Sequence, residues 1–200
     1  MVSLDDIVFI CWAIFIFYWA INWKNVKPSK EKKWGMAKLR FILLGFIIIA
    51  IFISKKFNLF TSCHPGLSDC HYLLFQSGSI SPTLQILGSI LTIVGVIFAV
   101  LARRTLADNW SSTIDLKMDH ELITNGIYGY VRHPIYTGML SMVLGAVLVF
   151  QSFTVFLIFL FVSVIFMFRI KSEEILMTKT FPKEYPKYKE KVKALIPFIW

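Results

Sequence analysis

The chain has 200 residues, of which 56% are hydrophobic and 16% are charged, and its mean hydropathy is +0.67. A soluble domain cannot bury so much apolar surface, so the composition excludes an ordinary water-soluble protein and indicates an integral membrane protein. The formal net charge is +9. Loop topology and attraction to anionic lipids account for this charge without a nucleic-acid partner.

Five segments are apolar and long enough, or nearly so, to cross a bilayer, because a spanning helix needs about 20 apolar residues. In chain order they are residues 7–23, 37–54, 84–102, 135–150 and 153–168. Only Gln151 and Ser152 separate the last two segments, which predicts a tight helical hairpin. Residues 169–192 are expected to form a helix at the cytosolic face, interrupted near Pro182 and Pro186. The predicted fold class is an all-α integral membrane protein with about five transmembrane helices and a C-terminal helix on the cytosolic face.

Positive charges predict the orientation of these spans. The loop at residues 24–40 contains seven Lys or Arg residues against Glu31 alone, and the C-terminal tail is also rich in lysine. The loop at residues 55–79 has only two lysines. The positive-inside rule therefore predicts that the N-terminus is outside and that the 24–40 loop and the tail are inside, which agrees with five spans. Asp5 and Asp6 precede the first span and no small-residue cleavage site follows it, so a secretory signal is not expected.

No repeat or low-complexity linker interrupts the chain, and we expect a single membrane domain over residues 1–200. Three N-terminal spans occupy residues 1–102. The composition changes at Arg103, and the polar residues that could carry chemistry are concentrated in residues 103–200. Trp110 follows the third span and is expected to be an interfacial anchor.

Cys63 and Cys70 lie in the loop predicted to be outside, and a histidine follows each of them. Two interpretations of these cysteines stay open: they are unlinked loop residues, or they form a disulfide within the loop. The spacing fits no zinc module, so no metal site is predicted. Neither pairing of these cysteines nor an oligomeric state follows from the sequence.

The densest group of polar residues runs from His120 to Gly138, where the fourth span begins. Pro134 suits the first turn of a helix, because its missing N–H would have no partner there in any case. The amides of residues 135–137 would then be unpaired within the helix, and a helix N-terminus favours a carboxylate or a phosphate. Arg132 and His133 would add donors at the same place. The alternative is a plain helix start whose arginine reaches lipid headgroups.

A second polar group, residues 169–174, follows the fifth span directly. Arg169 and Glu173 are four residues apart and therefore share a helix face. One interpretation is an ion pair within the helix. The other is functional: Arg169 would bind a carboxylate in a bidentate manner while Glu173 accepts hydroxyl or amine hydrogens. Charged residues at a membrane boundary favour the functional interpretation.

Several nucleotide, metal and hydrolase motifs are absent from the sequence. It contains no G-x-G-x-x-G after a strand, no P-loop, no H-E-x-x-H and no evident Ser/His/Asp set. The two polar groups instead resemble, in order and on either side of a hydrophobic hairpin, those of the isoprenylcysteine carboxyl methyltransferases and the related phospholipid methyltransferases. The resemblance covers roughly residues 103–200, and it is carried by residues 122–138 and by Arg169, Glu173, Glu174, Leu176, Phe181, Tyr185, Tyr188 and the terminal Ile196-Pro197.

This resemblance implies a membrane methyltransferase that uses S-adenosylmethionine and releases S-adenosylhomocysteine. It implies that residues 103–200 form the cofactor- and substrate-binding part, and the shortness of the chain resembles a prokaryotic member. It also implies a substrate-binding role for Arg169 and catalytic roles for Arg169, Tyr136 and Glu173. The cofactor-binding residues that it implies are His120, Glu121, Leu122, Ile123, Tyr128, His133, Pro134, Ile135, Tyr136 and Glu173.

The implied reaction is methyl ester formation on a prenylcysteine-like, lipophilic carboxylate that enters from the bilayer. A carboxylate is already ionised at neutral pH, so positioning and exclusion of water are the main tasks, and proximity can supply several kcal/mol. Three alternatives stay open. A phospholipid amine methyltransferase would need a base such as Glu174 or His133, an NADPH-dependent sterol or ene reductase has a similar C-terminal pattern, and a channel-like protein would leave both polar groups without a purpose.

Overall fold

The computed structural model describes residues 3–22, 81–110 and 121–197. The long helices are α1 (Leu4–Ile21), α3 (Pro82–Leu106), α4 (Pro134–Phe150) and α5 (Phe153–Thr180). Short elements are the 3-10 turns η1 (Ala107–Asn109) and η2 (Gly126–Gly129) and the helix α6 (Glu184–Lys191). Within these described ranges there is no β-strand, only an isolated parallel bridge between Val131 and Lys193. The predicted all-α class is therefore confirmed.

Helix α1 begins three residues before the predicted first span, because a capping box fixes its start. The Ser3 hydroxyl accepts the N–H of Asp6 at 3.2 Å, and the Asp6 carboxylate accepts the N–H of Ser3 at 2.9 Å. Acidic side chains in this first turn also suit the positive end of the helix dipole. The aspartates that precede the predicted span thus begin the helix itself.

Helices α3 and α4 are antiparallel and pack at very short range through glycines spaced seven residues apart. Gly88 lies opposite Gly145 and Gly95 opposite Gly138, so that a methyl group added at any of the four would come within 2.7 Å of a carbonyl oxygen of the facing helix. Small residues let helix backbones approach this closely inside a membrane, where packing rather than the hydrophobic effect holds helices together. This pair is the rigid centre of the fold.

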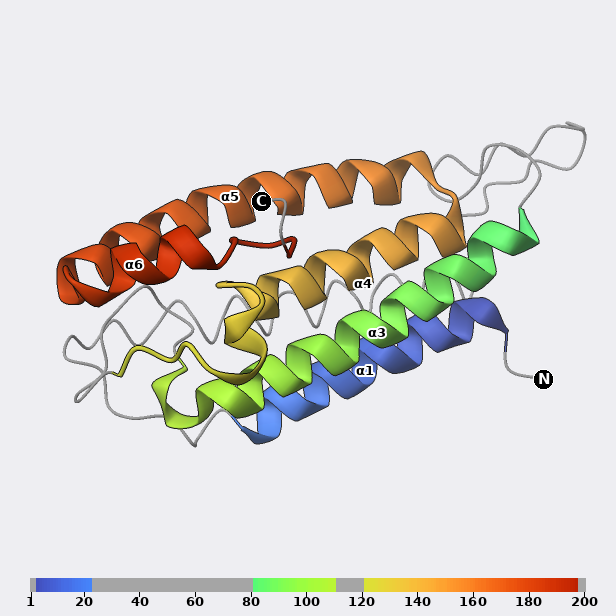
Figure 1. Cartoon of the computed structure of the whole chain (residues 1–200). Coiled ribbons are helices and arrows are strands. Elements are labelled where there is room, and N and C mark those ends of the chain that lie inside the picture. Colours follow the sequence, from blue (N-terminus) through green and yellow to red (C-terminus); the bar gives the residue numbers. More distant parts are fainter. Residues whose placement is uncertain (1–2, 23–80, 111–120, 198–200) are drawn as a thin grey trace, which may run out of the picture.

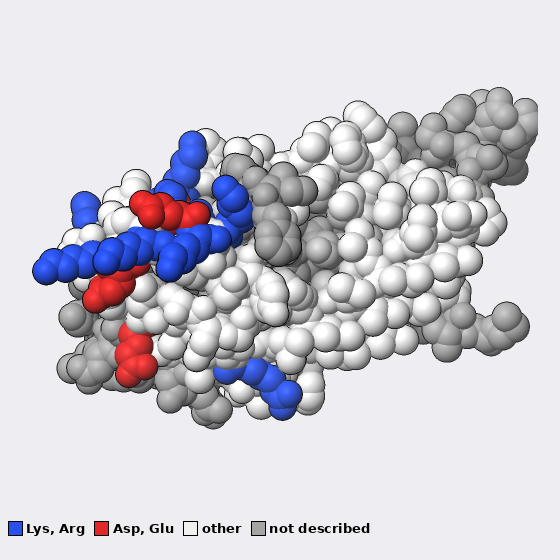
Figure 2. Space-filling model, viewed as in Figure 1, with Lys and Arg blue, Asp and Glu red and all other residues white. Residues whose placement is uncertain are grey.

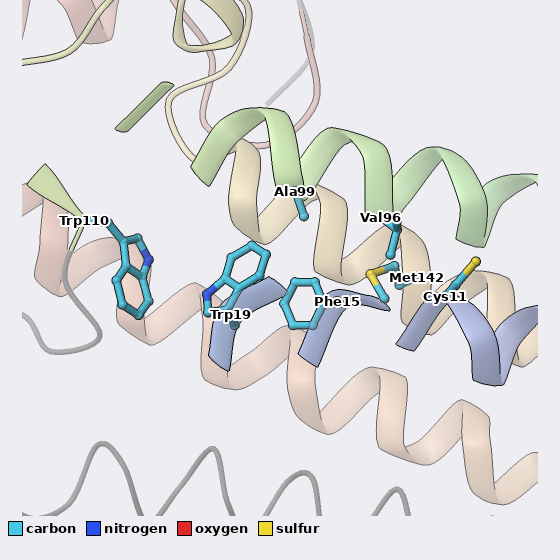
Figure 3. Packing of buried hydrophobic residues seen from close by; sticks show 7 residues of the cluster. All are labelled: Cys11, Phe15, Trp19, Val96, Ala99, Trp110 and Met142. Atoms are coloured by element: carbon cyan, nitrogen blue, oxygen red, sulfur yellow. The ribbon is translucent and has the colours of Figure 1, made fainter. Parts of the chain in front are cut away.

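The apolar core lies where α1, α3 and α4 meet, as Figure 3 shows. Phe15 and Trp19 of α1 stack with their ring centroids 4.1 Å apart, next to Val96 and Ala99 of α3 and Met142 of α4. Met142 and Ala99 are fully buried. The three helices together hold the start of α4 in place at the polar end of the bundle.

Gln151 and Ser152 alone connect α4 to α5, which confirms the predicted tight hairpin. Gln151 adopts the left-handed conformation that ends many helices, with φ of 45°. Its amide side chain bonds the backbone of Ser81 twice, accepting from the N–H at 3.1 Å and donating to the carbonyl at 3.0 Å. The turn of the hairpin is thereby fastened to the start of α3.

Helix α5 has 28 residues and continues far beyond the predicted end of the fifth span at residue 168. It ends at Thr180, just before Pro182, so the predicted interruption there is confirmed. The predicted interruption at Pro186 is wrong. Pro186 is the third residue of α6, where a backbone N–H has no partner within the helix and a proline removes no bond. As Figure 1 shows, α6 folds back beside the end of α5.

Three described helices are long and apolar enough to cross a membrane, namely α1, α3 and most of α5, and α4 is a shorter apolar helix. The predicted span at residues 37–54 lies outside the described residues, as do the cationic 24–40 loop and Cys63 and Cys70. On the face drawn in Figure 2, charged side chains gather toward the end that contains α6, and the rest is uncharged. Apart from Asp5 and Asp6 at the start of α1, the charges visible on this face thus lie at one polar end of an apolar bundle.

Candidate active site

The first residues of α4 are positioned by an extended segment at the polar end of the bundle. The N–H of Arg132 donates to the carbonyl of Lys193 at 2.8 Å, and the N–H of His133 donates to the carbonyl of Ala194 at 3.0 Å. His133 is then the N-cap of α4, and Pro134 occupies the first helical position as predicted. Residues 192–195, which we call the C-terminal strap, therefore fix the start of the helix from outside.

Tyr136, Arg169 and Glu173 form one connected group. The Tyr136 hydroxyl donates to Glu173 Oε1 at 2.5 Å and accepts the Nε–H of Arg169 at 2.5 Å. Arg169 Nε also lies 3.1 Å from Glu173 Oε1, as an ion pair one helical turn apart. The sequence left open whether Arg169 and Glu173 form a helical ion pair, and in this structure they do. Both side chains keep about a quarter of their surface exposed, 26% and 23%, so they remain accessible to a ligand.

Arg132 and Glu174 form a second, more deeply buried group. Glu174 Oε1 accepts from Arg132 Nη2 at 2.5 Å and from Nε at 3.0 Å, and Glu174 Oε2 accepts from Lys189 Nζ at 2.5 Å. Arg132 Nη1 also donates to the backbone carbonyls of Lys189 and Val192. The expectation that Arg132 offers donors to a ligand is therefore wrong for this structure, because its described contacts are all internal.

The imidazole of His133 lies between the two glutamates. Its Nδ1 is 3.7 Å from Glu173 Oε2 and its Nε2 is 3.5 Å from Glu174 Oε1. These separations are too long for good hydrogen bonds, and Nε2 is buried without a hydrogen-bond partner among the described residues. A buried polar atom without a hydrogen-bond partner is energetically costly unless a water molecule or a ligand pairs with it. His133 thus lies between the two glutamates without a close hydrogen bond to either of them.

The amides at the start of α4 differ in part from expectation. The N–H of Thr137 bonds the carbonyl of His133 at 3.0 Å and is therefore already paired, which corrects the prediction for this residue. Within the described part of the chain, the N–H groups of Ile135 and Tyr136 have no such acceptor. The side chain of Ile135 packs against the apolar core. Two backbone donors beside His133 therefore remain for an anionic group.

Tyr128 is buried in η2, and its carbonyl accepts the hydroxyl of Tyr188 from α6 at 2.6 Å. Burial raises the pKa of Tyr188 to about 12, so its hydroxyl keeps its proton and can donate at neutral pH. Burial likewise raises the pKa of Tyr128 well above its usual value. This contact fastens the turn to α6 next to the candidate site.

The remaining predicted cofactor residues are less closely associated with the site. His120 lies outside the described residues. Glu121 is exposed, Leu122 and Ile123 are partly exposed, and all three lie in irregular structure before η2. Among the described contacts, no hydrogen bond or ion pair connects them to His133, Tyr136 or Glu173.

Trp110, which the sequence predicted to be an interfacial anchor, packs inside the protein instead. It is buried, and the guanidinium carbon of Arg103 lies 4.7 Å from the centroid of its ring. The Arg103 guanidinium also donates to the carbonyls of Ala107 at 2.5 Å and Asn22 at 3.1 Å. Arg103 thereby joins the ends of α1 and α3 at the polar end of the bundle.

Comparison with known proteins identifies the family. Residues 83–184, just over half of the chain, match the family model described as phospholipid methyltransferase. This chain belongs to the phospholipid methyltransferase family. The matched residues include α4 and all of α5, and so contain His133, Tyr136, Arg169 and Glu173.

Relatives within this methyltransferase family carry the name protein-S-isoprenylcysteine O-methyltransferase. The protein from Saccharomyces cerevisiae is 35% identical over 129 residues, which cover 63% of this chain and 54% of the yeast protein. The protein from Schizosaccharomyces pombe is 40% identical over 82 residues, covering 40% of this chain and 35% of that one. A probable enzyme from Oryza sativa subsp. indica is 31% identical over 115 residues, covering 56% and 60%. The chain spans about half the length of these relatives, which confirm the resemblance predicted from the sequence.

A solved structure has the same fold. The eukaryotic intramembrane Ras methyltransferase ICMT (isoprenylcysteine carboxyl methyltransferase) superposes with a TM-score of 0.61 at 20% sequence identity. The match covers 98% of this chain and 68% of that one. Together with the apolar helices, it establishes this family member as an integral membrane protein. A prokaryotic origin stays a prediction.

Sequence reasoning missed the parts of the site that come from the end of the chain. Glu174 was considered only as a possible base, and Lys189, Tyr188 and the C-terminal strap were given no role at the site. The adjacent Glu173-Glu174 pair was a usable signal, because neighbouring helical positions point in different directions and so need different partners. No local pattern indicates that residues 192–195 return to the start of α4.

Proposed function

We propose that this chain transfers a methyl group from S-adenosylmethionine to the carboxylate of a lipophilic, prenylcysteine-like substrate in the membrane. Its family and the names of its relatives support methyl transfer. The observation that carries the proposal is the group formed by Tyr136, Arg169 and Glu173 beside His133, at the polar end of an apolar bundle. A cation at a membrane boundary, with a carboxylate and a phenol holding it, suits recognition of an anionic headgroup on an apolar tail.

The residues at the start of α4 and on α5 fit S-adenosylmethionine, which supplies an electrophilic methyl group on a sulfonium. The cofactor carries both an anionic carboxylate and cationic ammonium and sulfonium centres. The free amides of Ile135 and Tyr136 suit the anion, and the partly exposed Glu173 suits a cation. The unpaired His133 Nε2 offers a further polar contact. We therefore propose cofactor-binding roles for residues 133–136 and Glu173, and also for Tyr128 and residues 120–123.

In this proposal Arg169 binds the substrate carboxylate and orients it. Tyr136 and Glu173 hold Arg169 through its Nε, and so fix the plane of the guanidinium. A carboxyl group has an ordinary pKa near 4 and is ionised at neutral pH, so the chain need not supply a base. The work of the site is to align two bound groups and to exclude water, which can lower a barrier by several kcal/mol.

The proposed orientation has the polar end of the bundle in the cytosol, with the N-terminus outside. Lysines in the tail and Arg103 and Arg104 at the end of α3 support this orientation by the positive-inside rule. The cofactor would then reach the site from water. The outer surface of α5 is apolar and exposed, so the substrate tail could stay in the bilayer. In this proposal, residues 1–200 form one domain whose catalytic part is residues 103–200.

Methylation of a phospholipid amine is the second candidate, and the description of the family favours it. An amine must lose a proton before or during transfer, so a base is necessary. Glu174 accepts hydrogen bonds from Arg132 and Lys189 and is poorly suited to that role. His133 is the remaining choice. Because Glu174 is already hydrogen-bonded and poorly suited to act as a base, its contacts support a carboxylate rather than an amine as the methyl acceptor.

Two measurements on the purified chain in lipid nanodiscs test this proposal. Calorimetric titration with S-adenosylhomocysteine should give saturable binding, and a methylation assay should favour a farnesylated cysteine over phosphatidylethanolamine. Absence of S-adenosylhomocysteine binding would contradict a methyltransferase, and preference for the phospholipid would identify the amine as acceptor.

Arg169→Ala tests the assignment of the carboxylate. Turnover should fall about 100- to 1000-fold, as for other charge-stabilising donors, while S-adenosylhomocysteine binding is largely retained. Lys171→Ala removes the same charge from an exposed position two residues away and is the matched control. Turnover near the wild-type level in Arg169→Ala would show that the role of Arg169 is wrong.

A further inference from the structure

One guanidinium group connects three separate segments at the polar end of the bundle. Arg132 precedes α4, yet its side chain bonds Glu174 on α5 and the carbonyls of Lys189 on α6 and Val192 in the C-terminal strap. The two charged side chains are only 7% and 11% exposed. Arg132 donates through Nε and Nη2 to the same oxygen of Glu174, and charge-assisted bonds of this kind are short and strong. We call the Arg132–Glu174 pair the brace.

Each residue of the brace is next in sequence to a residue for which we propose a role in cofactor binding. His133 follows Arg132, and its N–H is held by Ala194 of the strap. Glu173 precedes Glu174 on α5 and points instead to Tyr136 and Arg169. Because neighbouring helical residues have a fixed angle between them, the direction of Glu174 determines the direction of Glu173.

Besides the brace, the described polar contacts between α4 and α5 that restrain rotation of α5 are the hydrogen bonds of Arg169 and Glu173 to Tyr136. Large apolar side chains are exposed along most of the length of α5, which packs mainly on α4. Near the site, Ile170 of α5 is buried with Ala194 and Leu195 of the strap, and Tyr136 packs beside them. That apolar cluster is compatible with several rotations of α5, whereas a buried ion pair in which one carboxylate oxygen accepts two guanidinium N–H groups is compatible with few.

We propose that Arg132 and Glu174 are positioning residues that set the rotation of α5 against the start of α4, and so place Glu173 and His133 for the cofactor. Neither residue contacts the reacting groups. The part of this inference that concerns the cofactor rests on the proposed function. The part that concerns the placement of α5 and the strap does not.

The test compares Glu174→Gln with Glu190→Gln in the full chain in nanodiscs. Both changes remove one negative charge at constant shape, but Glu190 is exposed on α6. In Glu174→Gln, amide hydrogen exchange of residues 131–137 and 192–195 should become faster. The affinity for S-adenosylhomocysteine should fall about tenfold or more, which corresponds to about 1.4 kcal/mol. Glu190→Gln should leave both unchanged.

Kinetics separate positioning from simple stabilisation. If the brace sets the rotation of α5, Glu174→Gln should raise the KM for S-adenosylmethionine about tenfold, and the KM for the prenylcysteine substrate should rise as well, because Arg169 and Glu173 are on the same helix. If it only stabilises the fold, the variant should unfold at a lower temperature while its folded molecules keep wild-type KM values. Glu174→Asp keeps the charge and shortens the side chain, and should be intermediate in exchange and in affinity.

Wild-type exchange rates and wild-type S-adenosylhomocysteine affinity in Glu174→Gln would overturn the proposal that the brace positions α5. Should Glu174→Gln not fold, Glu174→Asp decides by the same two measurements, and wild-type values in it would overturn the proposal equally. A wild-type chain that binds no S-adenosylhomocysteine refutes the proposed function. In that case the exchange measurement still decides whether the pair positions α5.

Discussion

Replacing Gly145 by alanine tests the close packing of α3 and α4. In an ordinary helix this change stabilises, because alanine is favoured over glycine by about 1 kcal/mol. Here the new Cβ would lie 2.5 Å from the carbonyl oxygen of Gly88 and 2.9 Å from the backbone nitrogen of Thr92, and closer still to Thr92 Oγ1. Thr92 is fully buried and already bonds the Gly88 carbonyl, so it cannot turn away without loss. The sign of the effect should therefore reverse.

The size of the effect follows from how far the helices must separate. Ordinary contact begins at 3.4 Å, so relieving the 2.5 Å approach to the Gly88 carbonyl requires the helices to separate by about 0.9 Å, and the closer approach to Thr92 Oγ1 requires somewhat more. Each pair of touching atoms across the interface contributes about 0.1–0.2 kcal/mol of dispersion energy. A separation of this size would lose about a quarter to a half of that energy for each pair. Measured costs of overpacking are about 1–3 kcal/mol. For a chain of this size, such a loss lowers the unfolding temperature by about 2–12 °C.

Thermal unfolding in detergent, followed by tryptophan fluorescence, measures this change. Gly129→Ala is the control, because its new Cβ would meet only the Thr124 carbonyl at an ordinary 3.5 Å. Gly88→Ala and Gly145→Ala together should cost less than the sum of the two, since one separation relieves both contacts. An unfolding temperature of Gly145→Ala equal to or above that of the wild type would refute the close packing.

Three further substitutions test single contacts by the same unfolding measurement. Gln151→Ala removes both hydrogen bonds to Ser81 and should lower stability by about 1–3 kcal/mol. Tyr188→Phe removes one buried donor to the Tyr128 carbonyl and should cost about 1 kcal/mol, with faster exchange of residues 126–131. Arg103→Met leaves two carbonyls without their donor and should cost about 3 kcal/mol or more.

The controls for these variants remove similar groups that make none of the described contacts. Tyr130→Phe alters a tyrosine that is 67% exposed, and Arg104→Met removes a neighbouring exposed arginine. Both should lie within about 0.5 kcal/mol of the wild type. If Arg103→Met is no less stable than Arg104→Met, the buried arginine does not join α1 to α3.

The hydrophobic pattern predicted the four long helices of the described residues but not all of their ends. The hairpin followed from two polar residues between two apolar runs, and the N-terminal position of Pro134 followed from proline chemistry. Residues after 168 were predicted to be helical but in a separate helix at the cytosolic face, whereas α5 continues without a break through Lys, Glu and Met residues that also favour helix. Hydrophobicity indicates which residues the bilayer covers, whereas the length of a helix also depends on the helix propensity of the polar residues that follow.

The candidate site was predictable where its residues are close in sequence and unpredictable where they are not. The spacing of Arg169 and Glu173 predicted a shared face, and the structure adds Tyr136 as their common partner. Arg132 was misjudged because its partners lie 42 to 60 residues away, on Glu174, Lys189 and Val192. No periodicity within either segment encodes that pairing.

The α3–α4 pair and helix α5 are held in place by different kinds of contact. The glycine contacts fix α4 rigidly to α3 along its whole length, so the start of α4 can serve as a stationary reference for ligand groups. Within the described residues, helix α5 has no comparable interface, and many of its apolar side chains are exposed. An acceptor with a lipid tail needs such an open flank, but open flanks leave a helix free to rotate. The polar bonds at the end of α5 are therefore where rotation must be fixed, and Arg132 and Glu174 supply the most buried of them.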